Sequence, residues 1–391
     1  MLEKLKPQKM KQIKLVALLL LTSTIQLSVA QTKLPVVQAN SKTVDIKDGE
    51  RLIKGAWAIS PETNPDVYLT SSKRVTFYTD ISSISFKINP KVGVYNFIIL
   101  LNGKDSARTQ IKYQPSRLSI LKKAASYNYN DSRFVPTFTY QSKDDPNLLK
   151  IRQEFKLDSV AGTGNEVSRI LNVLHWVHNI VRHDGSSNNP TLKNAIDLIN
   201  VCRTEKRGVN CRMMATILNE CYLSLGFKSR YVTCMPKETE FDDCHVINMV
   251  YCNDLKKWIW ADPTFDAYVM NEKGQLLGLA EVRDRLINNK PLILNPEANW
   301  NRKASQTKEN YLDYYMAKNL YRLQCPVSSE YDTESFKDGK TVTYLELLPL
   351  DGLVQTPQKS ENKDLKSSQR TKNSHVNYKT NNPNLFWTKP E

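Results

Sequence analysis

The sequence of 391 residues lacks several patterns that mark well-known classes of protein. It contains no GxGxxG or GxxxxGK loop and no EF-hand loop, so nucleotide and calcium sites of these kinds are not indicated. Its seven cysteines include no CxxC pair, which argues against a zinc ribbon. After one short apolar run, no stretch approaches the roughly 20 apolar residues that a membrane-spanning helix needs. We therefore expect no cofactor, no metal ion and no stable membrane span.

Acidic residues are also few relative to basic ones. There are 55 lysines and arginines against 40 acidic residues, which gives a formal net charge of +15. Much of this excess lies near the two ends: residues 1–14 hold five lysines and one acidic residue, and residues 355–391 hold seven basic and three acidic residues. The rest of the chain has a charge of only about +7. With no basic–aromatic motif beside the lysines, nucleic acid is not expected as a partner.

The first 30 residues have the three parts of a secretory signal peptide. A basic stretch ends at Lys14, the apolar run Leu15–Leu21 follows, and small residues close the segment at Ser28-Val29-Ala30. The run is too short to span a membrane, and no cysteine follows it that could carry a lipid anchor. We predict that residues 1–30 are removed and that the protein is exported to the periplasm, the cell surface or the medium.

Residues 31–114 are expected to form a small β-sandwich-like module. Val94–Leu101 (VYNFIILL) has the composition of a buried strand, and Asn102-Gly103 predicts a hairpin to a partner strand at 107–113. Shorter alternating stretches precede it, as is typical of sandwiches built from many short strands. The module contains no cysteine, no histidine and no cluster of carboxylates. It is therefore interpreted as a structural or binding module.

The remainder is expected to contain a linker, an α+β catalytic domain and a tail. Residues 115–150 are predicted to be a linker that packs on the next domain, and residues 353–391 a polar, flexible tail. Between them, residues 151–352 show helical periodicity first and strand alternation later, which indicates helices packed on an antiparallel sheet. The expected helices are 165–183, 192–202 and 211–225, and the expected strands are 227–234, 245–252, 257–261, 321–325 and 341–348.

Cys211 is the residue that most clearly carries chemistry. It follows Asn210, a natural N-cap, and therefore opens the helix at 211–225. The first turn of a helix has unpaired N–H groups and the positive end of the dipole, which stabilise a thiolate. The same N–H groups can hold a developing oxyanion. Cys211 is thus a candidate nucleophile.

A cysteine nucleophile also needs a base and a group that orients the base. His245 opens one predicted strand, and Asp262 follows the next. If Cys252 faces Lys257 across the hairpin, then Asp262 lies opposite Ile247 and diagonal to His245. If the turn shifts by one position, Asp262 lies directly opposite His245. Either register brings imidazole and carboxylate within plausible reach.

These pieces resemble the transglutaminase-like superfamily of papain-like cysteine enzymes. The similar segments are RGVNCRMMATILNECYLSLGFKSRYV, CHVINMVY and KKWIWADPTFDAYV, within residues 165–270. The resemblance implies Cys211 as nucleophile, His245 as base and Asp262 as the orienting residue. One departure is Ile247, where the family often has an aromatic residue. The module at 31–114 lies outside the resemblance.

Other residues have more ordinary interpretations. His175, His178 and His183 are expected to have structural or surface roles, because no third ligand of a metal is apparent near them. Cys221 is expected to be a core residue. Trp258 and Trp260 lie two residues apart on one predicted strand. They are expected either to pack in the core or to line a cleft. With Cys211 set aside, six cysteines remain, which would allow up to three disulfides, and Cys234–Cys252 is the pairing we expect.

The predicted activity is acyl transfer on peptide or protein amides through a Cys211 thioester. Water as the acceptor gives a peptidase or amidase, and lysine gives a protein-glutamine transglutaminase. The resemblance to exported bacterial members favours hydrolysis. The alternative from another class is a non-catalytic envelope binding protein on the same scaffold. The sequence does not indicate the oligomeric state.

Overall fold

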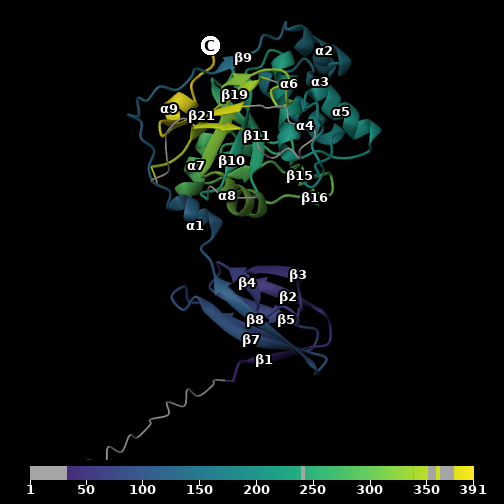
Figure 1. The fold of residues 1–391 in the computed structure, drawn as a ribbon, viewed down its shortest axis with the longest axis vertical. Coiled ribbons are helices and arrows are strands. Elements are labelled where there is room, and N and C mark those ends of the chain that lie inside the picture. Colours follow the sequence, from purple (N-terminus) through teal and green to yellow (C-terminus); the bar gives the residue numbers. More distant parts are fainter. Residues whose placement is uncertain (1–32, 239–242, 338, 351–357, 362–373) are drawn as a thin grey trace, which may run out of the picture. The chain divides into compact units, whose positions relative to one another are not determined.

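The computed structural model describes residues 33–238, 243–337, 339–350, 358–361 and 374–391. The chain divides into two compact units between Gln114 and Pro115 (Figure 1), where the predicted β-module ends. The predicted signal peptide, residues 1–30, lies outside the described residues. In the described part of the chain, no helix is both long enough and apolar enough to cross a membrane.

The first unit consists of two four-stranded sheets. One sheet has the order β1-β7-β8-β4, from strands Val36–Ala39, Val94–Leu101, Asp105–Tyr113 and Asp66–Thr70. The other has the order β3-β2-β5-β6, from strands Arg51–Ala58, Thr43–Asp48, Arg74–Tyr78 and Ser83–Lys87. The second sheet is antiparallel throughout, whereas in the first β1 and β4 pair in parallel with their neighbours.

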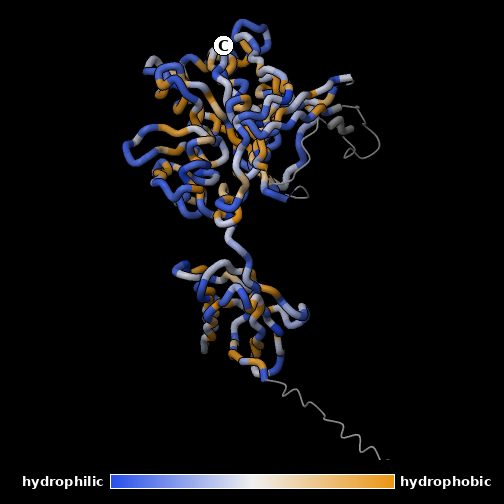
Figure 2. Tube along the Cα trace, turned by 90° about the vertical axis from the view of Figure 1, so that its left-hand side faces the viewer, coloured by the Kyte–Doolittle hydropathy of each residue, from blue (hydrophilic) through white to orange (hydrophobic). Residues whose placement is uncertain are grey.

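The two sheets of this unit enclose one apolar core. Hydrophobic residues recur along the strands of this unit in Figure 2. The rings of Phe77 on one sheet and Phe97 on the other are 5.1 Å apart, so the sheets pack face to face. The β7–β8 hairpin turns through Asn102 and Gly103, both with positive φ, and Leu101 pairs with Asp105. The predicted hairpin is therefore present, and its second strand begins at Asp105 rather than at Ala107.

The second unit, residues 115–391, is an α+β domain. Its α-helices are α1 Arg117–Lys122, α2 Pro146–Glu154, α3 Leu157–Ala161, α4 Glu166–Ile180, α5 Ala195–Thr204, α6 Cys211–Ser224, α7 Leu279–Ile287, α8 Ala317–Asn319 and α9 Pro383–Phe386. A π-helix, η1, spans Glu309–Met316. Short two-residue strands are β9 Thr139–Tyr140, β13 Val269–Met270, β14 Ile293–Leu294, β15 Asn299–Trp300, β16 Ala304–Ser305 and β18 Ser328–Ser329.

A seven-stranded sheet runs through this unit in the order β12-β11-β10-β17-β19-β21-β20. Its strands are Lys257–Ala261, His245–Cys252, Ser229–Met235, Arg322–Pro326, Thr341–Leu347, Ser374–Thr380 and Gln358–Glu361. All neighbouring pairs are antiparallel except β19 and β21, which are parallel.

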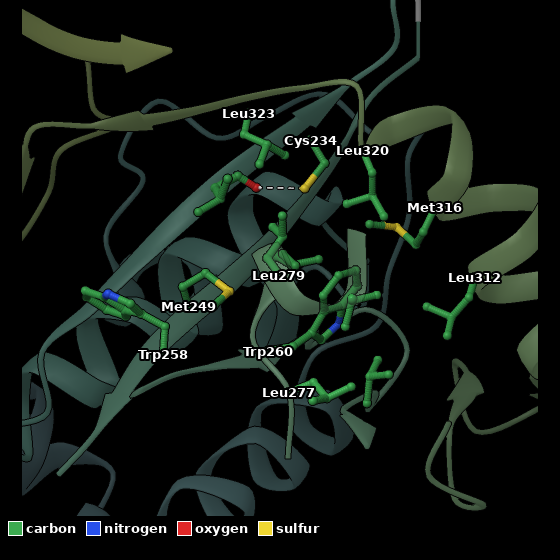
Figure 3. Packing of buried hydrophobic residues seen from close by; sticks show 14 of the residues in the cluster. Cys234, Met249, Trp258, Trp260, Leu277, Leu279, Leu312, Met316, Leu320 and Leu323 are labelled. Carbon is green, nitrogen blue, oxygen red and sulfur yellow. Dashed lines mark hydrogen bonds between the residues drawn. The ribbon is translucent and has the colours of Figure 1, made fainter. Parts of the chain in front are cut away.

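Helices cover both faces of this sheet, so its central strands are buried on both sides (Figure 1). On β11, Val250 and Cys252 pack with α2 to α6, whereas Ile247, Met249 and Tyr251 pack with α1, α7, η1, α8 and α9. Figure 3 shows part of this second layer. The alternation of side chains along a strand explains how one continuous apolar segment serves two cores.

The helices that carry the site begin with side-chain caps. Asn165 caps α4 and Asn210 caps α6, each accepting a backbone N–H three residues later. Helix α4 ends at Ile180, earlier than the predicted residue 183, because residues 182–184 turn aside to bond with Val209. A Cβ on Gly208 would lie 2.5 Å from the carbonyl oxygen of Arg182, so this close approach requires glycine.

The predicted linker, residues 115–150, is an integral part of the second unit. Leu121 of α1 is buried in the core below the sheet, and Leu148 of α2 is buried in the helical layer. The boundary predicted at residue 151 is therefore wrong and belongs at Pro115. The sequence of this segment is rich in polar residues typical of turns, so α1 and α2 were not predicted. Each of these short helices contributes only a few apolar residues to a core that consists mainly of residues from distant elements.

The prediction of a flexible tail at 353–391 is corrected for its last 18 residues. Strand β21 pairs with β19 from Thr341↔Ser374 to Leu347↔Thr380, and Phe386 of α9 is fully buried. The Arg230 guanidinium, stacked 3.9 Å from the ring of Phe138, donates to the carbonyl oxygen of Phe386 at 3.1 Å. Backbone pairing and one aromatic anchor thus hold a polar segment. Residues 353–357 and 362–373 of this prediction lie outside the described residues.

Replacing Phe386 by alanine should lower the free energy of unfolding by about 3–5 kcal/mol, because it removes a fully buried ring from the core. The measurement is urea unfolding followed by circular dichroism. Asn384→Ala, at an exposed position of the same helix, is the matched control and should change stability by less than about 0.5 kcal/mol. Equal stability of the two variants would contradict the docking of this segment.

The predicted Cys234–Cys252 disulfide is wrong, and all seven cysteines are free. In the antiparallel register of β10 and β11, Cys234 pairs with His245. Cys252 lies seven residues further along β11, roughly 23 Å away at the usual rise of a strand. A disulfide needs Cα atoms within about 7 Å. Neighbouring strands were correctly expected, but their register separates the two thiols.

Candidate active site

Cys211 occupies the first position of α6, as the sequence predicts. The side chain of Asn210 accepts the backbone N–H of Met213 at 3.1 Å and thereby fixes the start of the helix. The backbone N–H groups of Cys211 and Arg212 lie in the first turn, where a helix offers them no internal acceptor. The thiol is half-buried and packs beside Ala215, Tyr231 and Val246.

His245 and Asp262 form a buried hydrogen-bonded pair. Nε2 of His245 lies 2.7 Å from Oδ2 of Asp262, and neither side chain is exposed to solvent. The hairpin between them has Cys252 opposite Lys257, the first of the two registers expected from the sequence. Asp262 also accepts the backbone N–H of Thr264 at 2.9 Å through Oδ1, so both oxygens of the carboxylate are engaged.

The electrostatics of the site favour a thiolate–imidazolium pair. Burial alone raises the pKa of Cys211, but hydrogen bonds to His183 and His245 outweigh it and lower the pKa to about 6. Burial alone lowers the pKa of His245, but the charge of Asp262 and hydrogen bonds to Asp262 and Cys211 raise it on balance. At neutral pH the proton therefore rests on the imidazole and the negative charge on sulfur. The catalytic role of Cys211, His245 and Asp262 remains a prediction.

His183 is a second histidine at the thiol, contrary to the expected structural or surface role. Its backbone forms a parallel bridge with Val209, two residues before Cys211, and its side chain hydrogen-bonds to the Cys211 thiol. The indole N–H of Trp300 donates to Nδ1 of His183 at 3.2 Å. Since an indole nitrogen can only donate, a neutral His183 carries its proton on Nε2. This nitrogen is the one left to face the thiol.

The other two histidines of this segment have structural partners. His175 bonds to Asp266 through Nδ1 at 2.7 Å. His178 is buried and bonds to the carbonyl oxygen of Pro263, which holds the backbone next to Asp262. In the part of the chain that the structure describes, no group of three histidine, cysteine or acidic side chains has the arrangement of a metal site.

Two tyrosines of η1 contact the His245–Asp262 pair and were not foreseen from the sequence. The Tyr311 hydroxyl donates to Oδ2 of Asp262 at 2.5 Å, and the Tyr315 hydroxyl lies 3.3 Å from Nδ1 of His245. They follow Asp262 by 49 and 53 residues, in a region where the family resemblance offered no guidance. Their spacing of four residues is the one local sign that both belong to one helix face.

The two tryptophans left open by the sequence have different surroundings. Trp260 is fully buried, and its indole N–H donates to the Tyr311 hydroxyl at 3.2 Å. Trp258 lies on the same face of the sheet and borders a cavity of about 320 Å³ together with Met249, Leu279 and Trp387. Cys221 is fully buried in the helical core, as expected.

A family model described as "Transglutaminase-like superfamily" matches residues 153–263, a span that includes Cys211, His245 and Asp262. Residues 153–263 belong to the transglutaminase-like superfamily. The α+β architecture of the second unit agrees with this assignment. A comparison of the chain with curated proteins gave no match.

Three solved structures similar to this chain have different descriptions. A candidate cysteine protease from Cytophaga hutchinsonii is 21% identical, with a TM-score of 0.25, over 41% of this chain and 49% of the other. LapG from Legionella pneumophila, EGTA-treated, is 12% identical, with a TM-score of 0.26, over 47% of this chain and 98% of the other. Red sea bream transglutaminase is 11% identical, with a TM-score of 0.23, over 64% of this chain and 52% of the other.

Proposed function

We propose that this protein is an exported cysteine hydrolase that cleaves amide bonds of peptides or proteins through a thioester on Cys211. The observation that carries the proposal is the position of the Cys211 thiol at a helix N-terminus, hydrogen-bonded to His245, which is in turn bonded to the buried Asp262. A nucleophile, a base and an orienting carboxylate in this order are what acyl transfer requires. The export part of the proposal rests on residues 1–30 alone.

The reaction follows from the charge state of the site. The Cys211 thiolate attacks the carbonyl carbon of the amide, a C–S bond forms, and the carbonyl oxygen takes the negative charge. As the tetrahedral intermediate collapses, the C–N bond breaks, and the His245 imidazolium gives its Nδ1 proton to the leaving amine. The neutral His245 then takes a proton from water, and the resulting hydroxide equivalent cleaves the thioester and restores the thiolate.

The oxyanion has donors available from two elements. The backbone N–H groups of Cys211 and Arg212 point out of the first turn of α6. The Nε2–H of His183, held in that tautomer by Trp300, lies at the same thiol. Such preorganised donors usually contribute more to acyl transfer than any other single feature of a site.

Two alternatives share this scaffold. A lysine side chain in place of water would make the same thioester an intermediate of protein cross-linking, and the two reactions have an identical first half. A non-catalytic binding protein would have no need of a thiol whose pKa is about 6 beside a buried His–Asp pair. This last observation favours an enzyme.

The proposal is tested by incubating the purified protein with a defined peptide mixture and a fluorescent primary amine. Hydrolysis predicts new peptide termini by mass spectrometry and little fluorescence on the peptides. The same mixture with Cys211→Ala is the control for other proteases. Uptake of the amine without new termini would replace the hydrolase by a transglutaminase. Absence of both products would support the binding protein.

A further inference from the structure

The π-helix η1 is the element that contacts the His245–Asp262 pair from outside the matched family segment. Helices of this kind are rare and are frequently found at functional sites. Its Tyr311 is fully buried, and the Tyr311 ring packs 5.1 Å from Phe265 and 6.2 Å from Trp260. Figure 3 shows Trp260 in the same apolar layer as Leu312 and Met316 of η1. The ring is thus held in place independently of its hydroxyl.

A chain of hydrogen bonds runs through this hydroxyl. The Trp260 indole N–H lies 3.2 Å from the Tyr311 oxygen, and the Tyr311 oxygen lies 2.5 Å from Oδ2 of Asp262. The same Oδ2 lies 2.7 Å from Nε2 of His245. All four side chains are fully buried. Water therefore does not screen these hydrogen bonds, which lie in surroundings of low dielectric constant.

The chemistry of the groups fixes the direction of each bond. An indole nitrogen only donates, so the Tyr311 oxygen accepts from Trp260 and its own proton points to Asp262. Oδ2 then receives two donors, one from Tyr311 and one from His245. Since a carboxylate only accepts, the proton between Asp262 and His245 belongs on Nε2. A neutral His245 consequently has its lone pair on Nδ1, the nitrogen near Tyr315.

We propose that Tyr311 is a positioning residue, whose hydroxyl keeps the proton of the His245–Asp262 pair on Nε2 and limits the basicity of His245. The catalytic consequence of this role rests on the proposed function: a more acidic imidazolium gives its proton to the leaving amine more readily. Tyr311 acts through Asp262 and does not itself touch the reacting atoms.

The titration of His245 depends on several other groups, which must stay constant in any comparison. Titratable side chains near it come from β10, α6, η1 and α8, from the residue after β12 and from the residues before β11. These groups are Asp262, Cys211, Tyr315, Cys234, Cys244, Asp243 and Lys318. The substitution Tyr311→Phe changes none of them and retains the packed ring.

The test is the titration of His245 in full-length protein labelled with ¹⁵N-histidine, assigned with His245→Gln. Without the Tyr311 donor, Asp262 has only His245 and one backbone N–H to stabilise its charge. Tyr311→Phe should therefore raise the pKa of His245 by about 0.5–1 unit, since the Asp262 charge is then less well stabilised and only part of the lost hydrogen bond is felt at the imidazole. The kcat on any cleaved peptide should fall about tenfold.

Tyr314→Phe is the matched control, because Tyr314 lies on the same helix with 55% of its surface exposed. It should leave the titration of His245 unchanged. A second test places Tyr311→Phe in the Asp262→Asn background, where a residue that acts through Asp262 has no further effect on the titration. Thermal unfolding shows whether each variant is folded.

The titration needs no substrate, so it separates this proposal from the hydrolase proposal. An unchanged or lowered pKa of His245 in folded Tyr311→Phe would overturn the positioning role, and so would an equal shift in Tyr314→Phe. A shift that persists in the Asp262→Asn background would also overturn it. A raised pKa of His245 in Tyr311→Phe, in a protein that cleaves no peptide, would support the positioning role. It would contradict only the hydrolase proposal.

Discussion

Replacing Cys211 by alanine is expected to lower kcat/KM for amide cleavage by at least about 10⁴-fold. Loss of the nucleophile removes the thioester route entirely, and only the binding groups and oxyanion donors remain. Alanine fills the first position of α6 without disturbing the cap, because the cap is the side chain of Asn210. The measurement is the initial rate on a cleaved peptide, with thermal unfolding as the control for folding. Activity above about 1% of wild type would assign the nucleophile elsewhere.

The same residue should titrate at unusually low pH. Hydrogen bonds to His183 and His245 hold the pKa of Cys211 at about 6 despite its burial, so alkylation by iodoacetamide should be half-maximal near pH 6. An ordinary thiol reaches this point near pH 8.5. As the pH falls below 6, the thiolate takes up a proton and the rate declines. Burial raises the pKa of Cys221 and Cys234, which should stay unmodified in the folded protein.

Local features of the sequence predicted the elements that carry Cys211, His245 and Asp262. Strands β11 and β12 have the predicted bounds because two nearly continuous apolar segments, separated by the short turn at 253–256, leave little choice of register. Asn210 marked the start of α6 because an asparagine before a helical pattern is a strong cap. These rules depend only on neighbouring residues in the sequence. They are sufficient here because one hairpin and one helix carry all three residues.

The residues that surround this core of the site depend on long-range packing. His183 was assigned to a helix, whereas its backbone bonds to Val209 and leaves α4. Tyr311 and Tyr315 belong to η1. The apolar residues of this element indicate that one side of it is buried, but they do not indicate which part of the protein it packs against. The segment at 374–380 is polar, and its place in the sheet comes from backbone hydrogen bonds to β19, which composition does not reveal.

The substitution Asp262→Asn is expected to lower kcat/KM by roughly 10³–10⁴-fold, although it changes only one atom. Three donors meet the carboxylate: His245, Tyr311 and the backbone N–H of Thr264. An amide offers only one acceptor atom to them. If its oxygen faces His245, its NH₂ group opposes the N–H of Thr264. If it faces the other way, the NH₂ group opposes Nε2, and the proton of a neutral His245 moves to Nδ1, where it cannot act as a base.

The loss of the Asp262 charge should also be visible at Cys211. Asp262 raises the pKa of His245, and the imidazolium in turn helps to lower the pKa of Cys211. In Asp262→Asn the midpoint of iodoacetamide alkylation should therefore move upward from about pH 6 toward the ordinary value. Asp266→Asn is the matched control, because Asp266 is also a buried aspartate paired with a histidine, His175, at 2.7 Å. An equal shift in both variants would mean that the net charge around the site, rather than the His245–Asp262 pair, sets the pKa of Cys211. A shift confined to Asp262→Asn identifies Asp262 as the residue that stabilises the thiolate–imidazolium pair.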